Sequence, residues 1–198
     1  MNDITLDLTY MPKGHTGHLV GSQAVVDFVK QVDSINTITN MLEFGFNTGW
    51  SSALFFELTK TKITSIEKVK IEQSSKAVEI LQEKFAGRHT IIWGDSVDVA
   101  KKITNSEIPM PKFNFAFIDG GHFPDIVESD INLCKFLGIK HFIFDDPYHE
   151  NIKPALDKFD FKLVCEQEYP LYRYKHLKGY FTKSKNLNRK CYLSYFIL

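Results

Sequence analysis

The sequence predicts an α/β protein in which a mostly parallel sheet is covered by helices on both faces. Two observations support this prediction. Between residues 38 and 160, short apolar runs alternate with segments in which apolar residues recur at helical spacing. Each apolar run also ends at, or just before, an acidic residue, at the edge where sheets of this kind bind their ligands. A chain of 198 residues is long enough for one substantial core, so a single domain is expected.

Five buried strands are expected in the central part of the chain. Each is a short apolar or alternating run bounded by polar residues or glycine. The expected strands are Ile38–Phe44, Lys62–Ile66, Thr90–Trp93, Phe113–Ile118 and His141–Phe144.

Helices are expected after the first four of these strands, because apolar residues return there every three or four positions. The third helix is expected at about residues 96–103. The others are indicated by Trp50, Ala53, Leu54 and Leu58, by Val78, Leu81 and Phe85, and by Val127, Ile131, Cys134 and Leu137.

The two ends of the chain differ from this central part. Residues 1–37 are expected to form a partly helical cap, with apolar residues between positions 24 and 32. In residues 161–198, Phe161–Glu166 and Cys191–Leu198 resemble two strands with little helix between them. They are expected to close the sheet with an antiparallel strand. No repeat or linker marks a domain boundary.

Composition and charge exclude several classes of protein. The 24 basic and 24 acidic residues balance, so the net charge indicates neither a nucleic acid nor an acidic membrane as partner. No apolar run reaches the ~20 residues of a membrane-spanning helix, and no signal peptide is recognisable. Cys134, Cys165 and Cys191 are too scattered for a disulfide framework or a zinc site. Reduced thiols and a cytoplasmic location are therefore expected.

Acidic residues and glycines gather at the five strand ends. Carboxylates are seldom placed at the end of a buried strand for packing alone. Five acidic strand ends in succession therefore predict a ligand site at this edge of the sheet. The residues concerned are Glu43, Gly45, Gly49, Glu67, Gly94, Asp95, Ser96, Asp119–His122 and Asp145–Asp146.

The first strand end separates two classes of cofactor. A dinucleotide fingerprint G-x-G-x-x-G starting at Gly45 would need glycine at positions 47 and 50, where the chain has Asn47 and Trp50. Those glycines allow backbone amides to approach a pyrophosphate. Glu43 would repel a phosphate and suits an ammonium group. The loop therefore favours S-adenosylmethionine, which carries an α-amino group, a sulfonium and no phosphate.

Residues 43–49, Glu-Phe-Gly-Phe-Asn-Thr-Gly, resemble motif I of class I S-adenosylmethionine-dependent methyltransferases. The form of this run and the later Asp-Gly-Gly-His at 119–122 resemble the branch with macrocin-type and catechol-type O-methyltransferases. The resemblance runs from about Met41 to His149 and departs from the wider superfamily at Asn47, where glycine is preferred. It implies a Rossmann-like fold with a mostly parallel seven-stranded sheet and an antiparallel C-terminal strand. Residues 38–160 would then be the cofactor-binding core.

The resemblance also assigns roles in cofactor binding. Glu67 would accept hydrogen bonds from the ribose hydroxyls, and Asp95, with Ser96 beside it, would bind the adenine amino group. Two alternatives stay open from the residues alone: Glu67 as a surface acid, and Asp95 with Ser96 as a helix cap. Glu43 would bind the cofactor amino group, directly or through water. The other assigned pocket residues are Gly45, Asn47 and Gly49 in the loop, and Asp119 and Gly120 after the fourth strand.

A second group of residues follows the fourth and fifth strands. In metal-dependent members of the family, positions matching Asp119, Asp145 and Asp146 hold a divalent ion, and three oxygen ligands suit Mg²⁺. Such an ion would lower the pKa of a substrate hydroxyl. His122 matches the position of a general base, with Asp119 as its catalytic partner. Two alternatives stay open: His122 as a cap or pocket residue, and the acids without an ion.

The resemblance favours methyl transfer to an oxygen of a small molecule or sugar. Two rivals stay open: a nucleic-acid or protein methyltransferase, and a non-catalytic cofactor-binding module. The first rests on residues 173–190, which hold seven Lys or Arg and no acid, interleaved with aromatics. Nucleic acid is the less favoured partner, because the Asn/Asp-Pro-Pro-aromatic motif of amino-directed DNA enzymes is missing. The acceptor and the oligomeric state are not determined by the sequence.

Overall fold

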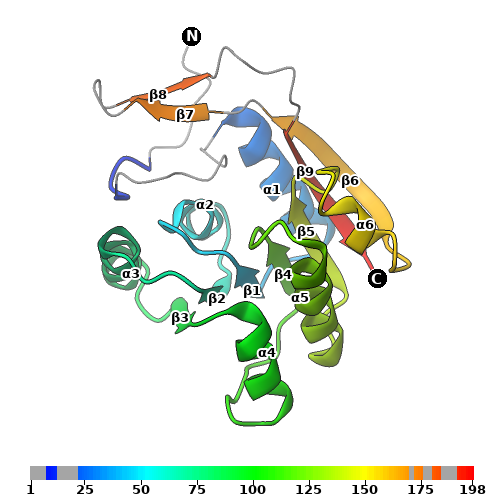
Figure 1. Cartoon of the computed structure of the whole chain (residues 1–198). Helices are drawn as coiled ribbons and strands as arrows, with labels where there is room; N and C mark the ends of the chain where they lie inside the picture. Colours follow the sequence, from blue (N-terminus) through cyan, green and yellow to red (C-terminus); the bar gives the residue numbers. More distant parts are fainter. Residues whose placement is uncertain (1–7, 13–21, 170–171, 176–179, 184–190) are drawn as a thin grey trace.

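The computed structural model describes residues 8–12, 22–169, 172–175, 180–183 and 191–198 (Figure 1). Its centre is a seven-stranded sheet in the order β3-β2-β1-β4-β5-β9-β6. This confirms the predicted fold class. No helix in the described ranges has both the length and the apolar character needed to cross a membrane.

Five parallel strands form the main part of the sheet, and all five were predicted. They are β1 (Asn40–Phe44), β2 (Lys62–Glu67), β3 (His89–Trp93), β4 (Phe115–Ile118) and β5 (His141–Asp145). The chain moves outward from β1 through β2 to β3 and then returns to the other side of β1 with β4. This reversal of strand order lies between β1 and β4. The carboxyl ends of β1 and β4 are therefore the expected place for a ligand.

Helices cover both faces of the sheet, because alternate strand residues point to opposite sides. One face packs against α1 (Gln23–Ile35), α2 (Trp50–Leu58) and α3 (Glu72–Lys84). The other packs against α4 (Ser96–Thr104), α5 (Pro124–Phe136) and the short α6 (Lys153–Leu156). Each face has its own apolar cluster, and β1 contributes Met41 to the first and Leu42 and Phe44 to the second.

The closing part of the chain differs in detail from the prediction. β9 (Cys191–Ile197) lies between β5 and β6 (Lys162–Tyr169) and is antiparallel to both. The strand that comes last in the sequence is therefore not at the edge of the sheet. β7 (Tyr172–Lys175) and β8 (Tyr180–Lys183) form a separate two-stranded sheet. Neither these two strands nor α6 was predicted from the sequence. These four-residue elements are too short to show a periodic pattern.

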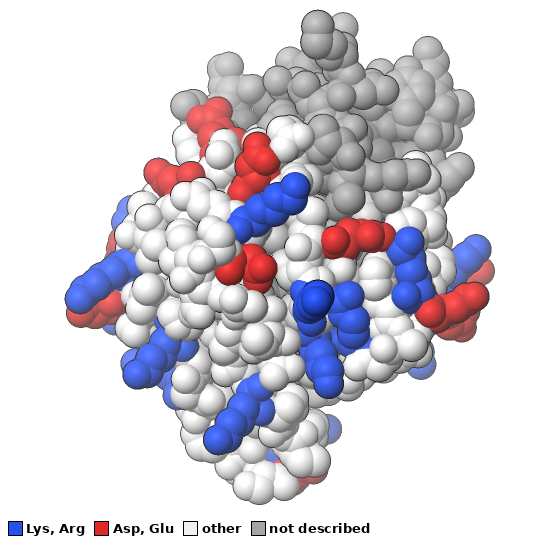
Figure 2. All heavy atoms as spheres, turned by 180° about the vertical axis from the view of Figure 1, so that it is seen from behind, with Lys and Arg blue, Asp and Glu red and all other residues white. Residues whose placement is uncertain are grey.

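Charged side chains are distributed without separation of sign on the face opposite to that of Figure 1. Figure 2 shows Lys and Arg side chains lying among Asp and Glu side chains on this face. This distribution is in keeping with the equal numbers of basic and acidic residues in the chain. The three cysteines are free, and Cys134 and Cys191 are buried.

Candidate cofactor-binding site

A pocket of about 270 Å³ lies at the carboxyl ends of the central strands. It is formed where β1, β2, β3 and β4 run into their following loops, which is the edge that the sequence predicted. Seven of the nine residues to which the resemblance assigned cofactor binding line it: Gly45, Asn47, Glu67, Asp95, Ser96, Asp119 and Gly120. The predicted residues Glu43 and Gly49 do not line this pocket.

A second, smaller hollow of about 90 Å³ adjoins the first. Gly45, Asn47 and Asp119 line both cavities. The smaller hollow is otherwise lined by the loop after β1 and the start of α2, including Thr48 and Ser51. The hydroxyl of Thr48 is buried there and has no hydrogen-bond partner among the described residues. The two cavities thus share Gly45, Asn47 and Asp119 as a common wall.

Gly45 permits a close contact between the loop after β1 and the end of β4. Its φ angle is +88°, a conformation that favours glycine. A Cβ atom at this position would lie 2.2 Å from the backbone oxygen of Asp119. Asn47 and Gly49 also have positive φ angles, of 48° and 73°. Asparagine tolerates this region better than most residues, which explains how Asn47 can stand where the wider superfamily prefers glycine.

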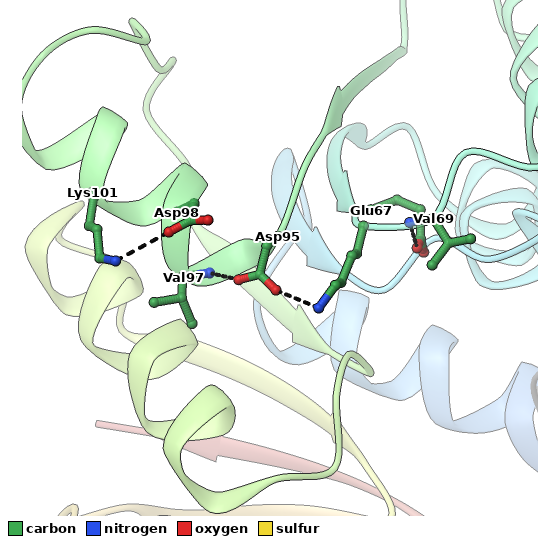
Figure 3. A network of polar contacts seen from close by, with 7 residues as sticks. Glu67, Val69, Asp95, Val97, Asp98 and Lys101 are labelled. Atoms are coloured by element: carbon green, nitrogen blue, oxygen red, sulfur yellow. Dashed lines mark hydrogen bonds and ion pairs between the residues drawn. The ribbon is translucent and has the colours of Figure 1, made fainter.

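Glu67 holds the loop after β1 in place. Its Oε2 accepts hydrogen bonds from the backbone N–H groups of Phe46 and Asn47, at 2.9 and 2.8 Å. Its Oε1 accepts from the N–H of Val69 at 2.7 Å (Figure 3). A carboxylate has about four acceptor positions, so one is left for a ligand in the pocket. Glu67 is therefore not a surface acid, and its predicted contact with ribose stays a prediction.

Asp95 combines the two alternatives that the sequence left open. Its Oδ1 accepts from the N–H of Val97 at 3.0 Å and caps α4, while the side chain also lines the pocket (Figure 3). Its Oδ2 forms an ion pair with Lys68 at 2.9 Å. The hydrogen bond from Lys68 lowers the pKa of Asp95. Both oxygens of this carboxylate therefore already have partners.

Glu43 lines neither cavity, and its predicted contact with the cofactor, directly or through water, stays a prediction. Its side chain is fully buried and accepts hydrogen bonds from the hydroxyls of Ser51, Ser52 and Ser65. Ser65 is also within hydrogen-bond distance of His89 Nε2, at 3.0 Å. Burial raises the pKa of Glu43. The carboxyl group thus ties the start of α2 to β1 and β2, and one of its partners, Ser51, lines the smaller hollow.

The divalent-ion site predicted at Asp119, Asp145 and Asp146 is not supported by the structure. Asp145 accepts a hydrogen bond from the Tyr169 hydroxyl, and Asp119 and Asp145 are hydrogen-bonded to each other. Burial raises the pKa of Asp145 to about 7 and that of Asp119 well above its ordinary value. Asp146 Oδ1 accepts a hydrogen bond from the backbone N–H of Tyr192, at 3.3 Å. Within the described ranges, no three His, Cys, Asp or Glu side chains are arranged to hold a metal ion.

His122 lies in the loop between β4 and α5, three residues after Asp119. The centre of its ring is 5.1 Å from that of His149, which follows β5. His149 Nδ1 accepts a hydrogen bond from the N–H of Asn151 at 3.2 Å. This contact places the proton of a neutral His149 on Nε2. Two imidazoles are therefore side by side at the ends of β4 and β5.

Comparison with known proteins indicates the kind of enzyme to which this fold belongs. A family model described as a methyltransferase domain matches residues 42–137, which contain β2, β3, β4 and the second half of β1. The match identifies just under half of the chain as a methyltransferase domain and supports an S-adenosylmethionine-dependent enzyme, consistent with the class I type.

Individual relatives of this methyltransferase are distant. Protein-L-isoaspartate O-methyltransferase of Thermococcus sibiricus (strain DSM 12597 / MM 739) is 28% identical over 81 residues, which cover 40% of this chain and 36% of that protein. The match thus spans about a third of the length of this curated relative.

Two solved structures show the same fold. The O-methyltransferase from Bacillus cereus in complex with SAH has a TM-score of 0.65 and 13% identity, over 92% of this chain and 84% of that chain. TrmN from Thermus thermophilus has a TM-score of 0.60 and 8% identity, over 91% of this chain and 49% of that chain.

The pocket of this methyltransferase fits the cofactor of its family. Four acids line it, namely Glu67, Asp95, Asp119 and Asp130, and the one base, Lys68, is paired with Asp95. Such a lining favours a cationic ligand without phosphate and disfavours a dinucleotide. Gly45 and Gly120 leave the space that side chains would otherwise fill.

Lys68 and Asp130 are pocket residues that the sequence did not predict. Lys68 follows directly after Glu67 and had no signal of its own. Asp130 did have a signal in the sequence. It lies on the apolar side of α5, together with Val127, Ile131 and Cys134. An acid at such a position is unusual in a packed helix.

Replacing Glu67 by alanine is expected to weaken the binding of S-adenosylhomocysteine by about 1–3 kcal/mol. The substitution removes an acceptor in the pocket and leaves the N–H groups of Phe46 and Asn47 without their partner. Isothermal titration calorimetry measures the loss. Glu67→Gln is the matched control, because its amide oxygen can still accept from the loop. An unchanged dissociation constant in Glu67→Ala would show that Glu67 does not contribute to cofactor binding.

Proposed function

We propose that this protein transfers a methyl group from S-adenosylmethionine to an oxygen atom of a small molecule or sugar. The observation that carries the proposal is the acidic, glycine-lined pocket at the carboxyl ends of β1 to β4, joined to a second hollow beside Thr48 and Ser51. The pair of imidazoles of His122 and His149, at the ends of β4 and β5, supports an acceptor that must lose a proton, as a hydroxyl does.

The two parts of the cofactor would occupy different cavities. The nucleoside part of the cofactor would occupy the larger pocket, with its ribose at Glu67. The amino-acid part would enter the smaller hollow, where the Thr48 hydroxyl lacks a partner and Ser51 is held by Glu43. Gly45 and Asp119, which line both cavities, lie where the two parts would join.

The bound cofactor supplies an activated methyl group on its sulfonium. The protein therefore contributes mainly by alignment of the acceptor oxygen with that methyl group. His122 would take the proton from the acceptor hydroxyl, since an imidazole with a pKa near ~6.5 is a suitable base at neutral pH. His149 lies beside it and would orient its ring or receive the proton in turn.

The test of the proposed cofactor is a comparison of two ligands. S-adenosylhomocysteine is expected to bind with a dissociation constant in the micromolar range, about −8 kcal/mol, and NAD far more weakly. The physical reason is the acidic lining of the pocket, which repels a pyrophosphate. Calorimetry with both ligands under the same conditions measures the difference. Tighter binding of NAD would contradict the proposed cofactor.

A transfer assay tests the acceptor class. S-adenosylhomocysteine formation would be followed with pools of hydroxylated small molecules, sugars, transfer RNA and unfolded protein. Turnover with the first or second pool, lost in His122→Ala without loss of cofactor binding, is the expected result. Turnover with RNA or protein alone would favour the rival based on residues 173–190. Most of that segment lies outside the described residues, apart from the backbone of β7 and β8.

A further inference from the structure

β6 is the outermost strand of the seven-stranded sheet on the side of β9 (Figure 1). Among the described strands its partner is β9, so the opposite side of β6 faces outward. The backbone of residues 162–167 makes no hydrogen bond to any other described segment. A strand that offers unpaired N–H and C=O groups in this way is a template for pairing with a further strand.

The first half of β6 also exposes apolar side chains. Leu163 and Val164 are 47% and 39% exposed, and the pairing with β9 is interrupted by a bulge between Leu163 and Cys165. α1 packs against β6, and its last residue, Ile35, is 49% exposed. The other edge strand differs, because every apolar residue of β3 is at least partly buried. The edge at β6 therefore combines unpaired backbone groups with exposed apolar side chains, which indicates an interaction surface.

The charges on β6 follow an order along the strand. Lys162 lies at its start, and Glu166 and Glu168 lie in its second half. Lys162 and Glu166 are exposed, and neither forms an ion pair with another described residue. Beside a parallel copy of this strand, like charges would lie level with each other. Beside an antiparallel copy, Lys162 would lie level with an acid of the second copy, and opposite charges across a strand pair attract.

A second copy of this chain meets these requirements without any other component. The 24 basic and 24 acidic residues balance, so two copies have no net repulsion to overcome. Antiparallel pairing of one strand with itself forms a two-fold interface, to which both copies contribute the same surface. Such an interface covers both β6 edges and leaves none for a third copy. Association through β6 therefore ends at a dimer and does not continue into a fibre.

We propose that the protein forms a two-fold dimer in which β6 pairs antiparallel with β6 of a second copy, with Val164 at the two-fold axis. Val164 is midway between Lys162 and Glu166, so this register brings the two charges level in both halves of the interface. The two sheets would join into one continuous sheet, with α1 of each copy on the same face. The cofactor pocket is formed by the ends of β1 to β4 and lies outside this interface. The proposal therefore goes beyond the proposed function and does not depend on it.

Sedimentation velocity of the full chain tests the dimer. One strand pair with its flanking helices is a small interface, so a dissociation constant of about 1–50 μM is expected. Val164→Lys places two like charges at the axis and is expected to weaken association by about tenfold or more. Val69→Lys is the matched control, because this valine is 56% exposed and follows β2, near the other edge of the sheet. It should leave the association unchanged.

Two further experiments test the orientation and the register. Lys162→Glu is expected to weaken the dimer by about threefold or more, and its combination with Glu166→Lys to restore it, because both charges of each pair are then reversed. Val164→Cys in a Cys165→Ser background should give a disulfide-linked dimer under mild oxidation with copper phenanthroline. Facing Cα atoms of antiparallel strands lie within the range of a disulfide. Val69→Cys in the same background should stay monomeric on a non-reducing gel.

Melting curves show whether each variant is folded, and Leu163→Lys replaces Val164→Lys if that variant is not. A wild type that stays monomeric across the expected concentration range would overturn the proposal. A dimer that is not weakened by the lysine on β6, or not cross-linked by Val164→Cys, would also overturn it, since another surface would then hold the copies together. If Lys162→Glu had no effect, or the double variant did not restore association, the antiparallel register would be overturned.

Discussion

Replacing Gly45 by alanine is expected to lower the free energy of unfolding by about 2–5 kcal/mol. The new Cβ atom would lie 2.2 Å from the backbone oxygen of Asp119 and 2.9 Å from the Cα atom of Gly120. Backbone atoms of a buried strand end cannot move aside as a flexible side chain can. The positive φ angle of 88° adds strain that any residue other than glycine must bear. The loop after β1 and the end of β4 would have to separate.

Gly138→Ala is the matched control for this prediction. Gly138 has a similar φ angle of 75°, but a Cβ atom there would meet nothing within 4 Å. Its substitution should therefore cost only the conformational strain, about 1–2 kcal/mol. Urea unfolding of both variants measures the difference, and calorimetry should show that only Gly45→Ala loses S-adenosylhomocysteine. Equal stabilities of the two variants would show that the loop does not pack against β4 as described.

Glu43→Ala is expected to destabilise the protein by about 2–4 kcal/mol. The substitution leaves the buried hydroxyls of Ser51, Ser52 and Ser65 without their shared acceptor. It also removes the connection between the start of α2 and the sheet. Thermal and urea unfolding measure the loss of stability.

Glu43→Gln distinguishes a positioning role from direct contact with the cofactor. The amide has the same shape, retains one acceptor oxygen and carries no charge, so most of the stability should be kept. Affinity for S-adenosylhomocysteine should also be close to that of the wild type, because Glu43 does not line the pocket. A stable Glu43→Gln variant with tenfold weaker binding would support the direct contact that the sequence suggested.

Local patterns were sufficient to predict the central fold. β1 to β5 and the helices between them follow from periodicity and from the residues at strand ends, within two residues at most boundaries. The position of β9 could not be predicted in this way. Its pairing with β5 and β6 joins residues far apart in the sequence, and strand order in a sheet is set by such long-range packing.

The sequence predicted that the site lies at the strand ends, but it did not predict the direction and the partners of each side chain there. Glu43 follows the alternation of β1, which turns it toward the same face as Met41 and α2, away from the pocket. The sequence showed the acid but not the three serines that surround it. Asp145 was predicted as a metal ligand from the family resemblance. Its hydrogen bond with Tyr169 could not be predicted, because Tyr169 comes from β6, a strand that the sequence pattern could not place relative to β5.

The insertion of β9 between β5 and β6 also determines the order in which the protein can fold while it is being made. β6 emerges from the ribosome before β9, yet among the described strands of the finished sheet its partner is β9. During synthesis β6 therefore has no strand to join, and β5 has an open edge toward it. The parallel half, with its cofactor pocket, can form first, and the nascent chain depends on the later residues 191–197 to cover the exposed edge of β5 against pairing with other chains.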